Sequence, residues 1–244
     1  MKQVIFGAAL CGAALAAATA ANADAGTYDF LYGSTNALVL GPTGIPTPNA
    51  AYISDVLNLY LEPNGYGGTT ATTVALTTPE TSDFLSSVPQ GEAILVNAVL
   101  ADYNAGDMGC DASGACSDPL TIFTYSQSSL DAALAEQQLA AHHIPTDALR
   151  FVMLGANNSV VPNDLYPTDI YNIHGDIYAE PGSLGASWQN FILGLELHEA
   201  YLGLTPAEVD SATTVVDGMT TINDIPTLTS TELWDALLNA LRAA

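Results

Sequence analysis

The segment that most constrains the fold is an apolar run, a serine-containing turn and a helical pattern in direct succession. Residues 120–125 are apolar and β-branched, which is typical of a buried strand. From Leu130 onward, apolar and small residues recur at spacings of three and four, which predicts a helix. Ser126 lies between the two. This context is that of a nucleophile elbow, in which a serine sits on a sharp strand-to-helix turn.

An elbow requires small residues two positions before and two positions after the serine, because the strand and the helix approach closely there. Thr124 and Ser128 occupy these positions, where glycine is usual. The alternative is that Ser126 caps an ordinary helix and has no chemical role. The motif alone leaves both interpretations open.

Charge excludes several classes of partner. The 244 residues include 26 acidic residues and only three basic ones, Lys2, Arg150 and Arg242, so the formal net charge is −23. Such a surface repels phosphate backbones, and we expect no nucleic-acid binding. Adhesion to anionic membrane surfaces is disfavoured for the same reason.

The N-terminus has the pattern of a secretory signal peptide. Lys2 precedes an apolar, alanine-rich stretch over residues 4–18, and residues 21–23 read Ala-Asn-Ala, a cleavage signature. We expect residues 1–23 to be removed, leaving a secreted or cell-envelope protein without an integral membrane span. A transmembrane anchor is the alternative, but the apolar run is short and ends at the cleavage signature.

Export also affects how the cysteines are interpreted. Cys11 would leave with the signal peptide, so Cys110 and Cys116 form a pair in an oxidising compartment. We predict a disulfide between them that pins the loop ahead of the strand at 120–125. Two free thiols are the alternative, and a zinc site is disfavoured because no histidine lies nearby.

Strand-like and helix-like segments alternate along the chain. Buried strands are predicted at 36–41, 120–125 and 149–155, and residues 72–76 are β-prone. Helical patterns cover residues 53–61, a stretch opened by Pro89, residues 130–141, and a C-terminal helix that begins with a capping box at Thr229 and Glu232. The predicted buried face of this last helix comprises Leu233, Trp234, Leu237, Leu238 and Leu241. The alternation predicts one α/β domain over residues 24–244, with a mostly parallel sheet covered on both faces.

A nucleophilic serine needs a base, and the base needs an orienting acid. In α/β-hydrolases these groups follow the order serine, acid, histidine. Ser126, Asp176 and His198 satisfy this order. His142 and His143 follow the elbow helix too closely and are expected at a solvated helix end.

His174 is the rival base. Asp164, Asp169 and Glu180 also precede His198, and composition does not choose among the acids. An oxyanion hole is the second requirement. The N–H of Gln127, the residue after the serine, is one expected donor. The loop after the first strand would supply the other, and because Pro42 has no N–H, Thr43 or Gly44 is the candidate. The alternative is that this loop is only a rigid turn.

Five segments in order resemble one known family. Residues 41–48 read Gly-Pro-Thr-Gly-Ile-Pro-Thr-Pro, 124–128 read Thr-Tyr-Ser-Gln-Ser, and 154–155 read Leu-Gly. Residues 176–181 read Asp-Ile-Tyr-Ala-Glu-Pro, and 198–201 read His-Glu-Ala-Tyr. Together they resemble the PE-PPE domain, a secreted actinobacterial serine hydrolase of the α/β-hydrolase fold that is distantly similar to cutinases.

The resemblance implies an α/β-hydrolase fold with Ser126 as nucleophile, Asp176 as orienting acid and His198 as base. The sequence departs from the family at several places. Thr124 and Pro42 each replace a family glycine, His174 and Gly175 replace a tyrosine before the acid, and a signal peptide stands where a PE or PPE segment is expected. The two glycine replacements bear on the reaction rate more than on the fold.

Three functions follow from these observations. The first is a secreted serine esterase that hydrolyses carboxylic esters of short- to medium-chain acyl groups through an acyl-enzyme. The second is an acyltransferase that passes the acyl chain to a sugar or lipid hydroxyl, and the third is a non-catalytic interaction protein. The substrate is expected to be a small-molecule or lipid ester, since basic residues for a strongly anionic substrate are scarce. No metal or organic cofactor is expected.

Overall fold

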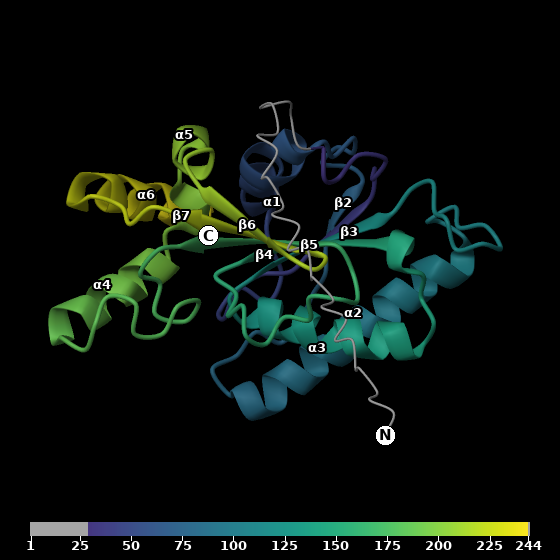
Figure 1. Cartoon of the computed structure of the whole chain (residues 1–244), viewed down its shortest axis with the longest axis horizontal. Helices are drawn as coiled ribbons and strands as arrows, with labels where there is room; N and C mark the ends of the chain where they lie inside the picture. The colour runs from purple at the N-terminus through teal and green to yellow at the C-terminus, as the bar shows by residue number, and fades with distance from the viewer. Residues whose placement is uncertain (1–28, 244) are drawn as a thin grey trace, which may run out of the picture.

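The computed structural model describes residues 29–243 (Figure 1). The predicted signal peptide, residues 1–23, lies outside the described residues. The strands are β1 (Ala37–Val39), β2 (Thr73–Ala75), β3 (Leu120–Tyr125), β4 (Leu149–Leu154), β5 (Thr168–Ile173), β6 (Thr213–Asp217) and β7 (Thr220–Ile225). The α-helices are α1 (Ala50–Val56), α2 (Phe84–Ala105), α3 (Gln127–Ala141), α4 (Trp188–His198), α5 (Pro206–Val209) and α6 (Ser230–Ala243). Short helical turns occupy Leu57–Leu61, Glu62–Asn64, Thr146–Ala148 and Tyr201–Gly203.

The described strands form one sheet in the order β2-β1-β3-β4-β5-β7-β6. Every neighbouring pair is parallel except β6 and β7, which form an antiparallel hairpin. The predicted α/β fold with a mostly parallel sheet is therefore confirmed. Because parallel strands end at the same edge, the loops after β1, β3, β4 and β5 meet there.

Helices cover both faces of the sheet (Figure 1). On one face α2 and α3 pack together, and a core cluster forms from apolar residues of these helices and of β3 and β4, such as Leu95, Leu139 and Phe151. On the other face α1, α6 and the turn at Tyr201–Gly203 cover a second cluster that includes Tyr60 and Phe123. Strands buried on both sides explain why the sequence shows continuous apolar runs instead of alternation.

Helix α2 begins earlier than the sequence predicts. Pro89 was expected to open it, but the helix starts at Phe84, and the N–H groups of Ser86 and Ser87 close the first turn onto the Asp83 carbonyl. Pro89 lies close to the helix start, where its missing N–H removes a single bond. This helix is long and apolar enough to cross a membrane by length and composition, but Leu95, Val96 and Val99 are buried in the core.

Helix α6 confirms the predicted capping box. The Thr229 N–H donates to the Glu232 carboxylate at 2.7 Å, and the Glu232 N–H donates back to the Thr229 hydroxyl at 3.4 Å. The predicted buried face is wrong in part. Leu233 is buried, but Trp234, Leu238 and Leu241 are 64%, 39% and 75% exposed. These exposed side chains border an apolar groove of about 370 Å³.

The hairpin of β6 and β7 was not predicted. Gly218 and Met219 form its two-residue turn, and Gly218 has a φ of 62°. A glycine at the first position of a two-residue turn is typical of a β-hairpin, and the sequence contains Gly218 between two β-prone runs. Ahead of β3, Cys110 and Cys116 form the expected disulfide across an isolated antiparallel bridge.

Candidate functional site

Ser126 lies at the turn between β3 and α3, as the elbow prediction requires. Its backbone has a φ of 60°, a conformation that residues other than glycine rarely adopt. Ser128 stabilises the turn, because its hydroxyl accepts the Tyr125 N–H at 3.0 Å and donates to the Tyr125 carbonyl at 3.1 Å. The residues around it therefore hold the strained backbone in place. Such strained conformations are concentrated at functional sites.

Thr124 fits the elbow in spite of its extra bulk. Its side chain is buried, and its hydroxyl lies 3.1 Å from that of Ser129. Ser129 in turn donates to the Leu154 carbonyl on the neighbouring strand β4 at 3.1 Å. The threonine thus joins a hydrogen-bonded chain between the strand and the helix in the place where a glycine is usual.

The structure brings Ser126, His198 and Asp176 together. His198 is the last residue of α4, and its Nε2 lies 2.7 Å from the Ser126 Oγ. Its Nδ1 lies 2.7 Å from the Asp176 Oδ2. Asp176 follows β5 in a tight turn and Ser126 follows β3, so both lie at the carboxyl edge of the sheet, and the end of α4 brings His198 between them. Asp176 and His198 are both buried.

Asp176 is surrounded by hydrogen-bond donors. The Tyr178 and Ala179 N–H groups donate to its Oδ1 at 2.8 and 3.2 Å, and the Tyr201 hydroxyl donates to its Oδ2 at 2.7 Å. Hydrogen bonds of this kind favour the charged form of a carboxyl, and they oppose the cost of burying the charge. A charged Asp176 would hold a proton on Nδ1 of His198 and leave Nε2 free to accept one from Ser126.

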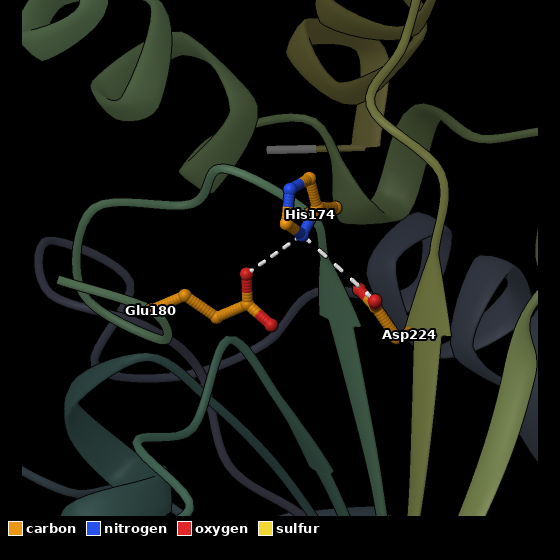
Figure 2. Close-up of side chains that lie close together, drawn as sticks. All are labelled: His174, Glu180 and Asp224. Carbon is orange, nitrogen blue, oxygen red and sulfur yellow. Dashed lines mark ion pairs between the residues drawn. The ribbon is translucent and has the colours of Figure 1, made fainter. Parts of the chain in front are cut away.

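The rival residues lie elsewhere. His174 is about half exposed, and its Nδ1 lies 3.0 Å from the Glu180 carboxylate and 3.8 Å from that of Asp224 (Figure 2). Asp169 is buried within β5, and burial raises its pKa to about 7. Asp164 is exposed. His142 and His143 are exposed at the end of α3, as predicted.

The cluster in Figure 2 has the ligand types of a divalent-cation site. The three ligand atoms of His174, Glu180 and Asp224 lie within 4.8 Å of one another. The cluster is partly exposed, and an ion pair between the ring and the carboxylates is sufficient to explain the arrangement.

The expected oxyanion donors have different surroundings. Gln127 opens α3, where a backbone N–H has no partner within the helix. Thr43 lines the same cavity as Ser126, and its hydroxyl donates to the Gln127 side chain at 2.8 Å. Gly44 is not available, because its N–H donates to the Glu80 carbonyl at 2.7 Å. Of the two loop candidates, Thr43 is therefore the one that the structure favours.

A cavity of about 570 Å³ opens over Ser126 and His198. Its walls are largely apolar and include Phe84, Leu130, Val160, Val161 and Tyr178. The Tyr178 ring also packs on the His198 imidazole, with 4.5 Å between the ring centroids. Among the described residues, neither lysine nor arginine lines the cavity, whereas Glu199 does, so the cavity suits an uncharged, apolar group.

Comparison with known proteins gives two relatives from Mycobacterium tuberculosis. The uncharacterised PPE family protein PPE28 is 30% identical over 217 residues, which cover 73% of this chain and 31% of PPE28. Esterase PE16 is 28% identical over 233 residues, which cover 80% of this chain and 42% of PE16. These relatives indicate a relation to the PE and PPE proteins. One of them is named an esterase. The chain spans less than half the length of either relative, and no protein-family model matches it.

Some residues at the site were missed from the sequence. The His-x-x-Tyr motif contains Tyr201, but its hydroxyl contact with Asp176 depends on the turn after α4. Ser87 accepts a hydrogen bond from the Gln127 side chain at 2.6 Å, and nothing in its sequence neighbourhood marks it.

Proposed function

We propose that the chain is a secreted serine esterase that hydrolyses carboxylic esters of short- to medium-chain acyl groups through an acyl-enzyme on Ser126. The observation that carries the proposal is the hydrogen-bonded line from the Ser126 Oγ through His198 to Asp176, with 2.7 Å at each contact. A serine hydroxyl becomes a nucleophile only when such a base is in reach and is itself oriented.

In the proposed reaction, His198 Nε2 accepts the proton as the Ser126 Oγ attacks the ester carbonyl carbon. The N–H groups of Gln127 and Thr43 stabilise the negative oxygen of the tetrahedral intermediate. His198 then gives its proton to the departing alcohol. Water then attacks the acyl-enzyme, with His198 again accepting the proton, and the carboxylic acid leaves as Ser126 recovers its hydroxyl. Asp176 stays ionised and stabilises the imidazolium throughout.

The cavity supports the choice of substrate. Its volume of about 570 Å³ and its apolar lining suit an acyl chain of modest length, and Phe84 and Val160 at its wall offer apolar surface to such a chain. The strongly negative chain would repel an anionic substrate before it reached the site. The relation to an esterase supports the same reaction class.

The acyltransferase alternative uses the same three residues and differs only in the acceptor. A non-catalytic protein would have no need to hold Ser126 at a φ of 60° beside a histidine that is itself hydrogen-bonded to a buried carboxylate. We therefore favour an acyl-enzyme mechanism over the non-catalytic alternative, and accumulation of a transfer product with an added alcohol would indicate the acyltransferase.

The test is covalent labelling by a fluorophosphonate probe, combined with hydrolysis of p-nitrophenyl esters of increasing chain length. Ser126→Ala should abolish labelling and reduce kcat by about 10⁶-fold, as removal of a triad nucleophile does. Ser183→Ala, at an exposed serine, is the control and should label normally. His198→Ala should be inactive, whereas His174→Ala should keep its activity. Labelling that persists in Ser126→Ala would refute the proposal.

A further inference from the structure

Two carboxyl groups are buried together behind the loop that carries Thr43. Glu80 is 1% exposed and lies in the segment between β2 and α2, while Asp131 is fully buried on α3. None of their four carboxyl oxygens has a hydrogen-bond partner of normal geometry among the described residues. Neither group takes part in the proposed reaction, so their burial calls for a different explanation.

A carboxylate only accepts hydrogen bonds, so two carboxyls in contact can bond to each other only when one is protonated. Burial, together with the neighbouring Glu80 and Glu92 charges, raises the pKa of Asp131 to about 9. Burial also raises the pKa of Glu80, which the Thr78 hydroxyl opposes only in part. Burial raises the pKa of Tyr52, and the nearby Glu80 charge raises it as well. The pair therefore holds a proton at neutral pH.

The packing around the pair is specific. A Cβ atom at Gly91 on α2 would lie only 1.9 Å from the Asp131 Oδ2, so the carboxyl fits only because this position is a glycine. Glu80 has a φ of 42°, one of three positive values among non-glycine residues of the described chain. A strained backbone and an adapted helix surface both indicate that the contact is held in one arrangement.

The pair is linked to the oxyanion loop through the backbone. The Glu80 carbonyl accepts the Gly44 N–H at 2.7 Å, directly beside Thr43. The next residue, Thr81, donates its N–H to the Ser87 hydroxyl at 3.0 Å. Movement of Glu80 would therefore be transmitted to the loop through Gly44.

Helix α3 contacts the same loop a second time. The Gln127 side chain donates to the Ser87 hydroxyl at 2.6 Å and accepts from the Thr43 hydroxyl at 2.8 Å. Gln127 and Asp131 lie four residues apart on α3, hence on one side of the helix. The loop is thus held to the elbow helix both through Gln127 and through the carboxyl pair.

We propose that Glu80 and Asp131 are positioning residues that share one proton and thereby hold Thr43 in place as an oxyanion donor. When alkaline pH removes the shared proton, the two negative charges repel each other and release the loop. The proposal rests on the function proposed above, since it describes how pH regulates that site. The loss of activity at alkaline pH would then depend on Glu80 and Asp131, which do not touch the substrate.

The first test is the dependence of kcat and KM on pH between pH 7 and 11. Wild type should lose kcat reversibly around the pH at which Asp131 titrates, about 9, with a much smaller change in KM. Asp131→Asn and Glu80→Gln keep the shape of the side chain and supply a permanent N–H donor, so both should retain kcat above this pH. Glu136→Gln is the matched control, because Glu136 is an equally buried carboxyl on α3 with a pKa of about 9, and it should behave like wild type.

A second measurement does not depend on activity. Carboxyl carbon NMR should show Glu80 and Asp131 titrating together, and the Thr43 methyl signal should shift at the same pH in wild type but not in Asp131→Asn. If these shifts occur in a protein that hydrolyses no ester, the esterase proposal fails and the shared proton stands. If an active Asp131→Asn variant loses kcat at the same pH as wild type, the positioning role is overturned and the esterase stands.

Discussion

Gly155 lies against the imidazole of His198. A Cβ atom at this position would be 2.9 Å from the His198 Cε1 and 3.2 Å from the Asp176 Oδ2. The glycine also has a φ of 58° at the end of β4. The Leu-Gly sequence at this strand end therefore has a physical reason, because only glycine leaves room for the base and its acid on the neighbouring loops.

The first prediction concerns this contact. Gly155→Ala should lower kcat by about 100-fold, because a displacement of the base by about 1 Å can cost this much. Gly106→Ala is the control, since Gly106 has a similar positive φ of 85° but no atom within 4 Å of the added Cβ. Both variants should lower the melting temperature. Equal kcat in the two variants would show that the contact with His198 has no effect.

The second prediction separates the acids. Asp176→Asn should reduce kcat by about 10⁴-fold with little change in the fold, because the amide favours the wrong histidine tautomer. Asp164→Asn changes an exposed rival and should leave kcat as it is. Steady-state kinetics with one ester decide between them, and a larger loss in Asp164→Asn would reassign the acid.

The third prediction concerns Tyr201, whose hydroxyl donates to Asp176 and accepts the Ile173 N–H at 2.9 Å. Tyr201→Phe should lower kcat by about 10- to 150-fold, since a hydrogen bond to a charged group contributes about 1.5–3 kcal/mol. Tyr178→Phe keeps the ring that packs on His198 and removes a hydroxyl from a half-exposed side chain, so its kcat should match wild type. Full activity in Tyr201→Phe would contradict the role of the hydroxyl.

The fourth prediction is a dependence of stability on pH. Burial raises the pKa of Glu136 to about 9 and that of Asp169 to about 7, whereas both groups titrate near 4 in the unfolded chain. The folded state thus keeps protons that the unfolded state has lost. The free energy of unfolding should decrease as the pH rises from about 4 to 9.

Thermal unfolding between pH 5 and 9 provides the measurement. Glu136→Gln should raise the melting temperature at pH 9 and change it little at pH 5, because the amide never has to hold a proton. A melting temperature that rises with pH in wild type would oppose the prediction.

The order of strands and helices from β1 to β4 could be predicted because buried parallel strands and the elbow helix have strong local patterns. Sequence order and family resemblance indicate Ser126, Asp176 and His198, but their mutual contacts depend on the sheet, which brings two loops and the end of α4 to one edge. Local patterns do not contain such contacts. For this reason the sequence alone leaves Gly44 as a candidate donor, although the carbonyl of Glu80, far along the chain, accepts its N–H.

In helix α6, by contrast, the sequence pattern predicts more burial than the structure has. Its periodic pattern of Leu and Trp predicts burial, but periodicity does not reveal how much of the face a neighbouring element covers. Leu233 reaches the core while Trp234 and Leu241 stay exposed. The sequence also does not predict that Glu80 and Asp131 are buried together, because buried acids have no sequence signature.

Strand β6 ends the sheet, and all five of its residues are exposed, including Val215 and Val216. Its outer backbone groups can pair with the same strand of a second molecule, as unprotected edges do. At neutral pH the net charge of −23 keeps such molecules apart. Acidification neutralises the surface carboxylates while it stabilises the folded chain. Solutions near pH 4, close to the isoelectric point of about 4.1, should therefore combine a high melting temperature with the lowest solubility, and the protein should precipitate folded instead of unfolding.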